Sequence, residues 1–199
     1  MNIEPVILES KFVRMEPLRA DHLDGLAAFA FDESLWLWTV NQISDMSGLK
    51  RYVESALSDA KRGVCLPFAT IEKESHKIVG STRFGNIDVT NCKTEIGWTW
   101  VARDWQRTRV NSEAKLLMLT HAFETWKCIR VELKTDALNE RSRAAILRIG
   151  AKEGGILRNH MITDSGRFRD SVYFSIIESE WNGVKRHLSE SLYGDGQKN

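Results

Sequence analysis

The alternation of polar and apolar residues along the chain predicts seven β-strands. It is most regular in Ile129–Asp136, where odd-numbered residues are directed to one face and the four charged residues between them to the other. A strand inside a parallel sheet is apolar on both faces, so we expect one face of this strand to be wet or to border a cleft. The other predicted strands are Val6–Glu16, Val64–Glu72, Lys77–Asp88, Thr94–Val101, Lys152–Ile162 and Phe168–Ile177.

Apolar residues three and four positions apart predict five helices in the intervening stretches. Polar residues that can cap a helix mark four of the starts, at Asp21, Ser47, Asn111 and Asn139. These helices are expected to run to Phe31, Lys61, Lys127 and Ile149, and the fifth from Ser179 to Leu192.

The segment Asp32–Ile43 follows neither pattern and contains Trp36 and Trp38. One interpretation is a short helix of the core, because runs of aromatic residues are usually buried. The other is an aromatic wall on the substrate side of a site, because concave sites are lined mostly by apolar and aromatic side chains.

The order of the elements predicts an α/β fold with one mixed central sheet and helices on both faces. No internal repeat or linker-like stretch divides the sequence, so residues 1–199 are expected to form one domain. Its core is expected to span about residues 6–188, and residues 193–199 to form a disordered tail.

Composition narrows the function classes. A net charge of +1 gives no general preference for nucleic acid, so such a role would need a local basic patch. The cysteines at 65, 92 and 128 have neither a disulfide nor a metal-binding spacing, so no metal is expected and reduced cytoplasmic thiols are predicted. No apolar run approaches the length of a membrane-spanning helix, and no membrane association is expected.

The stretch Thr94–Lys115 combines a strand, a turn that carries Arg103, Arg107 and Arg109, and the start of a helix. Free N–H groups and the dipole at a helix start favour a phosphate, and arginines add fixed positive charge. The alternative is a solvated basic turn. Strict alternation would place Ile96, Trp98 and Trp100 on one face of the strand, and Glu95, Gly97 and Thr99 on the other.

Four motifs, taken together, are specific: EIGWTWV, QRTRVN with the helix after it, VELKTDALNERSRAAILRIGAKEGGILRNH and RDSVYFSIIESEW. With them the chain resembles the GNAT superfamily of acyl-CoA-dependent N-acyltransferases, and most closely its RimJ/RimL-like branch. The resemblance extends from about residue 6 to 188. It implies a sheet of about seven strands that splay apart between the fourth, Thr94–Val101, and the fifth, Ile129–Asp136, with the cofactor's pantetheine arm in the gap.

By this resemblance, acetyl-CoA or another acyl-CoA is the co-substrate. The implied binding residues are Trp98, Thr99, Trp100, Val101, Gln106, Arg107, Thr108, Arg109, Val110, Asn111, Ser112, Asn139, Ser142 and Arg143. Arg109 and Asn111 stand where the family's pyrophosphate turn has small residues, which leaves the backbone geometry of the turn open.

The resemblance implies direct attack of an amine on the thioester, and arginines near the site would also suit a succinyl group. Ile146 stands where many of these enzymes have an acidic tyrosine, so Ser142 is the expected substitute near the thiolate. Glu95 is the first candidate for the base, His160 the second and Asp170 a weaker third.

An α-amine has a pKa about 2.6 units below that of lysine and needs a weaker base, which favours a protein N-terminus or a small amine as acceptor. One alternative function is a CoA-binding module without turnover. A less favoured one is a nucleic-acid-associated protein that uses Arg103, Arg107, Arg109, Arg141 and Arg143. A homodimer is plausible because such folds often pair through strands or C-terminal segments.

Overall fold

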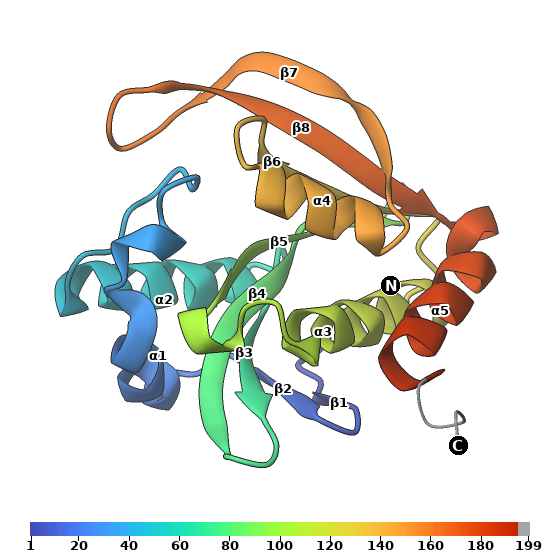
Figure 1. The fold of residues 1–199 in the computed structure, drawn as a ribbon, viewed down its shortest axis with the longest axis horizontal. Coiled ribbons are helices and arrows are strands. Elements are labelled where there is room, and N and C mark those ends of the chain that lie inside the picture. The colour runs from blue at the N-terminus through green and yellow to red at the C-terminus, as the bar shows by residue number, and fades with distance from the viewer. Residues whose placement is uncertain (195–199) are drawn as a thin grey trace.

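A computed structural model describes residues 1–194 of the chain (Figure 1). The strands are β1 Leu8–Glu9, β2 Val13–Pro17, β3 Leu66–Glu72, β4 Lys77–Asp88, β5 Lys93–Val101, β6 Arg130–Asp136, β7 Lys152–Ile162 and β8 Phe168–Ile177. The helices are α1 Leu23–Ala30, α2 Met46–Lys61, α3 Arg109–Thr120, α4 Glu140–Arg148 and α5 Glu178–Tyr193.

All eight strands form one sheet in the order β1-β2-β3-β4-β5-β6-β8-β7. Every neighbouring pair is antiparallel except β5 and β6, which are parallel. Their pairing is brief: Lys93, Thr94 and Glu95 pair with Arg130, Val131 and Glu132, and no later residues are paired. The predicted mixed sheet and the splay between these strands are therefore confirmed.

The sheet has one strand more than predicted because Val6–Glu16 is not continuous. The chain turns back after Glu9, and β1 pairs antiparallel with β2. Glu113 of α3 holds this turn, where its carboxylate accepts hydrogen bonds from the Ser10 hydroxyl and the Phe12 backbone N–H. A contact over a hundred residues away in sequence is not visible in local alternation.

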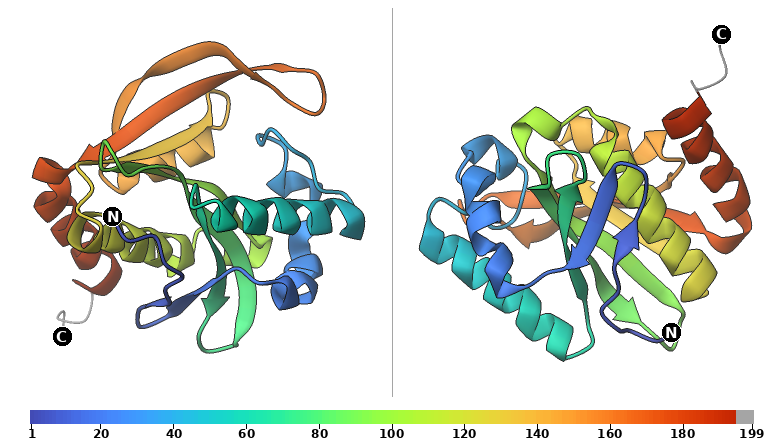
Figure 2. Two further views of the ribbon diagram at one scale, coloured as in Figure 1. Left: turned by 180° about the vertical axis from the view of Figure 1, so that it is seen from behind. Right: turned by 90° about the horizontal axis from the view of Figure 1, so that it is seen from below.

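The helices cover the two faces of the sheet in two groups (Figures 1 and 2). α1 and α2 pack on one face around Leu26, Leu49 and Trp100. α3, α4 and α5 pack on the other through residues such as Met118, Ile146 and Val184. β7 and β8 arch beyond α4 as a long hairpin.

Several predicted helix ends differ from the structure. The second helix is capped by Asp45 rather than Ser47, and the third by Thr108 rather than Asn111, because these earlier side chains reach the free N–H groups first. The third helix also becomes a π-helical turn after Thr120, while Asn139 caps α4 as predicted.

The last helix runs through Tyr193, so the predicted tail starts too early. The remainder of that prediction, residues 195–199, lies outside the described residues. At the first helix, the residues after Arg19 form a 3-10 turn that includes Asp21 and His22, and α1 proper begins only at Leu23.

A β-bulge in β5 overturns the predicted sides of its residues. Pairing with β4 shifts by one residue between Gly97 and Trp100, and Trp98 takes a left-handed φ of 50°. As a result Ile96 packs in the core beside α3, whereas Trp100 packs against α1 and α2. Thr99 is turned toward α3, where its hydroxyl bonds Lys115.

Among the described residues, no helix is long and apolar enough to cross a membrane. Within the same part of the chain, no cluster of three or more His, Cys, Asp or Glu side chains could hold a metal ion.

Candidate active site

A cavity of about 600 Å³ opens where β5 and β6 separate. Residues of both strands line it beyond their last paired position, including Trp98, Thr99 and Leu133. Its helical half is formed by the start of α3 and by α4. Its aromatic half is formed by the segment between α1 and α2 together with Tyr52, Glu95, Trp98, Met161 and Arg169.

The helical half presents the start of α3. Thr108 caps the helix and its hydroxyl accepts from the Val110 N–H at 3.3 Å, while other first-turn N–H groups have no carbonyl within the helix to bind. The left-handed residue in this turn is Arg107, with φ 62°. Arg109 and Asn111 are already helical, so their missing glycines cost no backbone strain.

The Arg109 side chain does not occupy the cavity at the start of α3. Its guanidinium lies 4.1 Å from the centre of the Phe12 ring. Asn111 does line the cavity, and its buried Oδ1 has no hydrogen-bond partner among the described residues. The free backbone N–H groups can bind a phosphate, and the unpaired Asn111 amide can bind an amide group. The arm of CoA carries both kinds of group.

Most residues predicted to bind the cofactor line the cavity. They are Trp98, Thr99, Trp100, Val101, Gln106, Arg107, Thr108, Asn111, Ser112, Asn139 and Ser142. The exceptions are Arg109, Val110 and Arg143. Val110 is buried in the core, and Arg143 points to the Ala137 carbonyl and to Glu153.

The start of α4 faces the same half. The Asn139 side chain accepts from the Ser142 N–H at 3.0 Å, and both residues line the cavity. Ile146, one turn further on, is buried and also reaches the cavity wall. The cavity wall here is therefore apolar where a tyrosine hydroxyl would stand.

Lys115 was not anticipated at this site. It is 6% exposed, and its Nζ donates to the Thr99 hydroxyl at 2.7 Å. The Thr82 hydroxyl lies 3.5 Å away, and no carboxylate pairs with the ammonium among the described residues. Burial lowers the pKa of Lys115 to about 7.

Glu95 belongs to the aromatic half of the cavity wall, and it is almost fully buried. Its Oε2 accepts from the Asn86 amide at 2.9 Å and lies 3.4 Å from the Lys134 ammonium. A Cβ atom at Gly97 would be 2.9 Å from Oε1, so the glycine makes room for this carboxylate.

The aromatic half explains several of the tryptophans. Trp36 is buried against Trp100 with ring centres 5.1 Å apart, and its indole donates to the Ala30 carbonyl. Trp98 is 41% exposed, and the Arg83 guanidinium lies between its ring and that of Tyr52. The segment Asp32–Ile43 contributes Trp36 and Ile43 to the core and also lines the cavity, but its one helical turn, Glu33–Leu35, has no buried residue.

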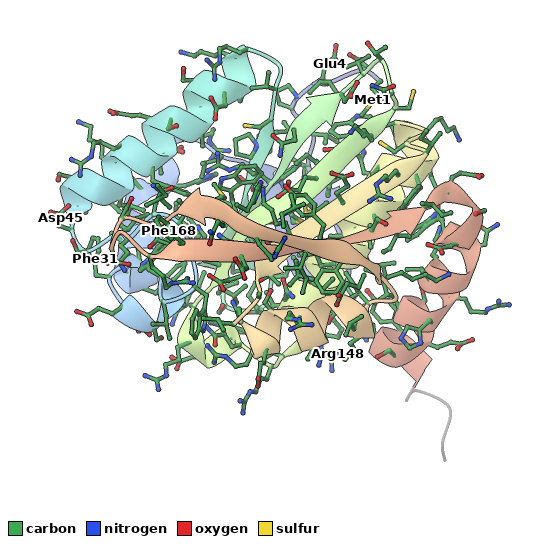
Figure 3. All side chains as sticks on the ribbon, turned by 90° about the horizontal axis from the view of Figure 1, so that it is seen from above. Met1, Glu4, Phe31, Asp45, Arg148 and Phe168 are labelled. Atoms are coloured by element: carbon green, nitrogen blue, oxygen red, sulfur yellow. The ribbon has the colours of Figure 1, made fainter. Side chains whose placement is uncertain are left out.

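The tip of the β7–β8 hairpin closes over this half. Asp164 accepts from the Gln42 N–H at 2.9 Å, and its own N–H donates to the Val40 carbonyl. Figure 3 shows the hairpin end with Phe168 on the same side as Phe31 and Asp45, which flank the segment between α1 and α2.

His160 and Asp170, the other proposed bases, are engaged elsewhere. His160 Nδ1 lies 3.0 Å from the Ser171 hydroxyl, its ring packs on Tyr173, and it does not line the cavity. Burial, then Lys134 and Arg169, lower the pKa of His160. Asp170 accepts from the Asn159 N–H, where the hairpin pairing is irregular.

The sequence analysis missed the two buried cations of the cavity wall, Lys115 and Arg169. Lys115 follows one turn after Asn111 and is charged on an otherwise buried helix face, which was an available signal. Arg169 lies in the regular strand β8, where nothing local distinguishes it from Arg167.

The sequence matches the family described as Acetyltransferase (GNAT) domain over residues 13–152. Bacillus subtilis YdaF, whose name marks it as a candidate ribosomal N-acetyltransferase, is 34% identical over 108 residues. That match covers 54% of this chain and 58% of YdaF, so the chain spans less than two thirds of that relative.

Solved structures agree with this match. A GCN5-related N-acetyltransferase from Brucella melitensis is 30% identical and superposes with a TM-score of 0.89. The superposition covers 98% of this chain and 89% of the Brucella chain. Mycobacterium smegmatis RimJ in complex with CoA-disulfide is 20% identical over 95% of this chain and 96% of its own, with a TM-score of 0.81, which supports the fold. The chain belongs to the GNAT acetyltransferase family.

Proposed function

We propose that this acetyltransferase moves an acetyl group from acetyl-CoA to a primary amine by direct attack, with the α-amine of a protein N-terminus or a small amine as acceptor. One observation carries the proposal. A single cavity connects the helix start at Thr108 with the buried carboxylate of Glu95 and the aromatic half beyond it.

The helical half is the proposed site for acetyl-CoA. The first-turn N–H groups of α3 and the Arg107 side chain would bind the pyrophosphate. The pantetheine arm would occupy the gap between β5 and β6, where the backbone groups of Trp98 and Thr99 have no partner on β6. Asn111 and Asn139 would bind its amide groups.

Glu95 is the proposed base. Its carboxylate is held in place by Asn86 and Lys134, and it would attract a cationic amine and accept its proton directly or through a water. The amine nitrogen then forms the new C–N bond as the C–S bond breaks. Ser142 is the proposed donor toward the leaving thiolate, itself or through a bound water.

The choice of an α-amine rests on chemistry and on relatives. A carboxylate is a modest base, and an α-amine is easier to deprotonate than lysine by about 3.5 kcal/mol. YdaF is named as a candidate ribosomal N-acetyltransferase, which supports an amine of a protein as the acceptor. A longer acyl group such as succinyl, a homodimer and a cytoplasmic location stay predictions.

The test is thiol release from acetyl-CoA with three acceptors: short peptides with a free N-terminus, the same peptides N-acetylated beforehand, and simple primary amines. We expect release with the free peptides and none with the blocked ones. Glu95→Gln should lower kcat about 10²- to 10⁴-fold. Glu54→Gln, an exposed change on α2, is the matched control.

Failure would take two forms. If CoA binds but no amine in the panel is acylated by acetyl-CoA, a binding module without turnover replaces this proposal. If Glu95→Gln retains the wild-type kcat at every pH, the proton is accepted by another group and Glu95 leaves the mechanism.

A further inference from the structure

Arg169 is a buried cation in the wall of the aromatic half. Its side chain is 8% exposed, and it lines the cavity. Its Nε is buried with no hydrogen-bond partner among the described residues, and the nearest carboxylate oxygen, Oδ2 of Asp136, is 3.6 Å away. A buried arginine donor without an acceptor is costly and calls for a further partner.

Asp136 is shared with other partners, and its ion pair with Arg169 is longer than its ion pair with Arg167. Its Oδ2 forms a close ion pair with Arg167, and its Oδ1 accepts from the Leu138 N–H. Arg167 itself lies over the Trp38 ring, at the mouth of the aromatic half. One carboxylate is thus shared by two guanidinium groups.

The charges around this half do not balance. Arg83, Arg167, Arg169 and Lys134 are four cations, whereas Asp136, Glu95 and Asp164 are three carboxylates. An excess positive charge in a buried wall favours an anionic ligand. A carboxylate matches the planar fork of an arginine, which can bind it through two parallel hydrogen bonds.

Glu95 and Arg169 border the same cavity, one offering a carboxylate and the other a guanidinium. Such a pair fits a ligand that carries both an amine and a carboxylate. Building on the proposed transfer reaction, we propose that Arg169 binds a carboxylate of the acceptor and selects amines that carry one close by. The aromatic rings of Trp38 and Trp98 would contact the acceptor's apolar part.

A carboxylate near the amine can come from a free amino acid or from an acidic side chain at the start of a peptide. The experiment compares three matched pairs at saturating acyl-CoA. They are phenylalanine against phenylalaninamide, a tripeptide amide beginning with Glu against one beginning with Gln, and succinyl-CoA against acetyl-CoA with phenylalaninamide.

For the wild type we expect kcat/KM to favour the carboxylate member of the first or second pair by roughly 10- to 100-fold, mainly through KM. Arg169→Gln should abolish that preference, and Arg169→Lys should keep part of it. Arg158→Gln, which removes an exposed arginine of β7 outside the cavity, should leave it intact. Thermal midpoints and CoA affinity of each variant check that the fold is retained.

Binding of each acceptor to the CoA-loaded protein, measured by calorimetry, separates this inference from the proposed reaction. Suppose that no amine is acylated, that wild type binds the acid more tightly than the amide, and that Arg169→Gln loses this difference. The carboxylate site would then stand, and the proposed reaction would fail. Equal binding and turnover of acid and amide by wild type would overturn the site. A preference seen only for succinyl-CoA would overturn the assignment to the acceptor.

Discussion

Lys115 and Arg169 are both buried cations in the wall of one cavity, yet their surroundings differ. Lys115 comes from α3 and has only hydroxyl groups within hydrogen-bond distance of its Nζ. Arg169 comes from β8 and has a carboxylate nearby, which Arg167 also uses. The Lys115 ammonium is thus buried with no carboxylate beside it among the described residues, whereas the buried Arg169 shares one carboxylate with the partly exposed Arg167.

The surroundings differ because a buried lysine can lose its proton within the accessible pH range, whereas an arginine cannot. Burial lowers the pKa of Lys115 to about 7, so this side chain can become neutral and needs no counter-charge. An arginine stays protonated at any accessible pH, so a buried one must have an anion. The charge of Lys115 in the helical half can therefore change near neutral pH. Arg169 in the aromatic half keeps its charge, which Asp136 and the proposed carboxylate of the acceptor would balance.

Asp136→Asn should have the largest effect on this comparison. The substitution leaves Arg167 and Arg169 without their shared carboxylate in a buried place. We expect the free energy of unfolding at pH 7 to fall by about 3–5 kcal/mol, as for other broken buried pairs. Denaturant unfolding measures it, with the exposed Glu54→Gln as control. A loss below about 1 kcal/mol would mean that Asp136 does not hold the two arginines.

Lys115→Met should remove a pH dependence. In the unfolded chain Lys115 keeps its proton up to its ordinary pKa of 10.5, whereas in the folded protein it loses it above about 7. Between these values the unfolded chain binds more protons, so this lysine makes wild-type stability rise with pH. The slope is at most about 1.4 kcal/mol per pH unit.

The measurement is the difference in unfolding free energy between wild type and Lys115→Met at pH 6, 7, 8 and 9. The variant should be relatively more stable at pH 6, and its advantage should shrink as pH rises. A difference that does not change with pH would show that Lys115 keeps its charge in the folded protein.

Thr99→Val should give the smallest change and sharpen the same point. The Thr99 hydroxyl, 2.7 Å from Nζ, favours the charged form of Lys115, and the substitution removes it. We expect a loss of about 1 kcal/mol at pH 6 and a further fall in the pKa of Lys115, followed by NMR of its side chain. Thr82→Val, with its hydroxyl 3.5 Å away, should shift that pKa less. Equal shifts would contradict the geometry.

The sequence predicted the helical half well because its signals are local. A strand, a basic turn and a capped helix follow one another within Thr94–Lys115, and Asn139 and Ser142 lie on one turn of α4. The bulge at Trp98 escaped prediction because regular alternation cannot register one inserted residue. It moved Trp98 and Trp100 away from the side that holds Ile96.

The aromatic half could not be read from the sequence in the same way. Asp164 meets Gln42 across 122 residues, Arg167 meets Asp136 across 31, and Lys134 reaches Glu95 from the neighbouring strand. None of these partners is marked by spacing or capping. They become neighbours only when β8 joins β6 and the hairpin tip folds over the segment between α1 and α2.

By itself, the sequence determined the order of the elements and the basic turn before a capped helix, because alternation, caps and charge act within a few residues. The resemblance to the family implied the splayed strands. The tertiary structure decided which charges are buried together and which lack partners. Burial depends on the whole sheet and both helical layers, so the unpaired Nε of Arg169 and the lone ammonium of Lys115 emerge only when the chain is folded.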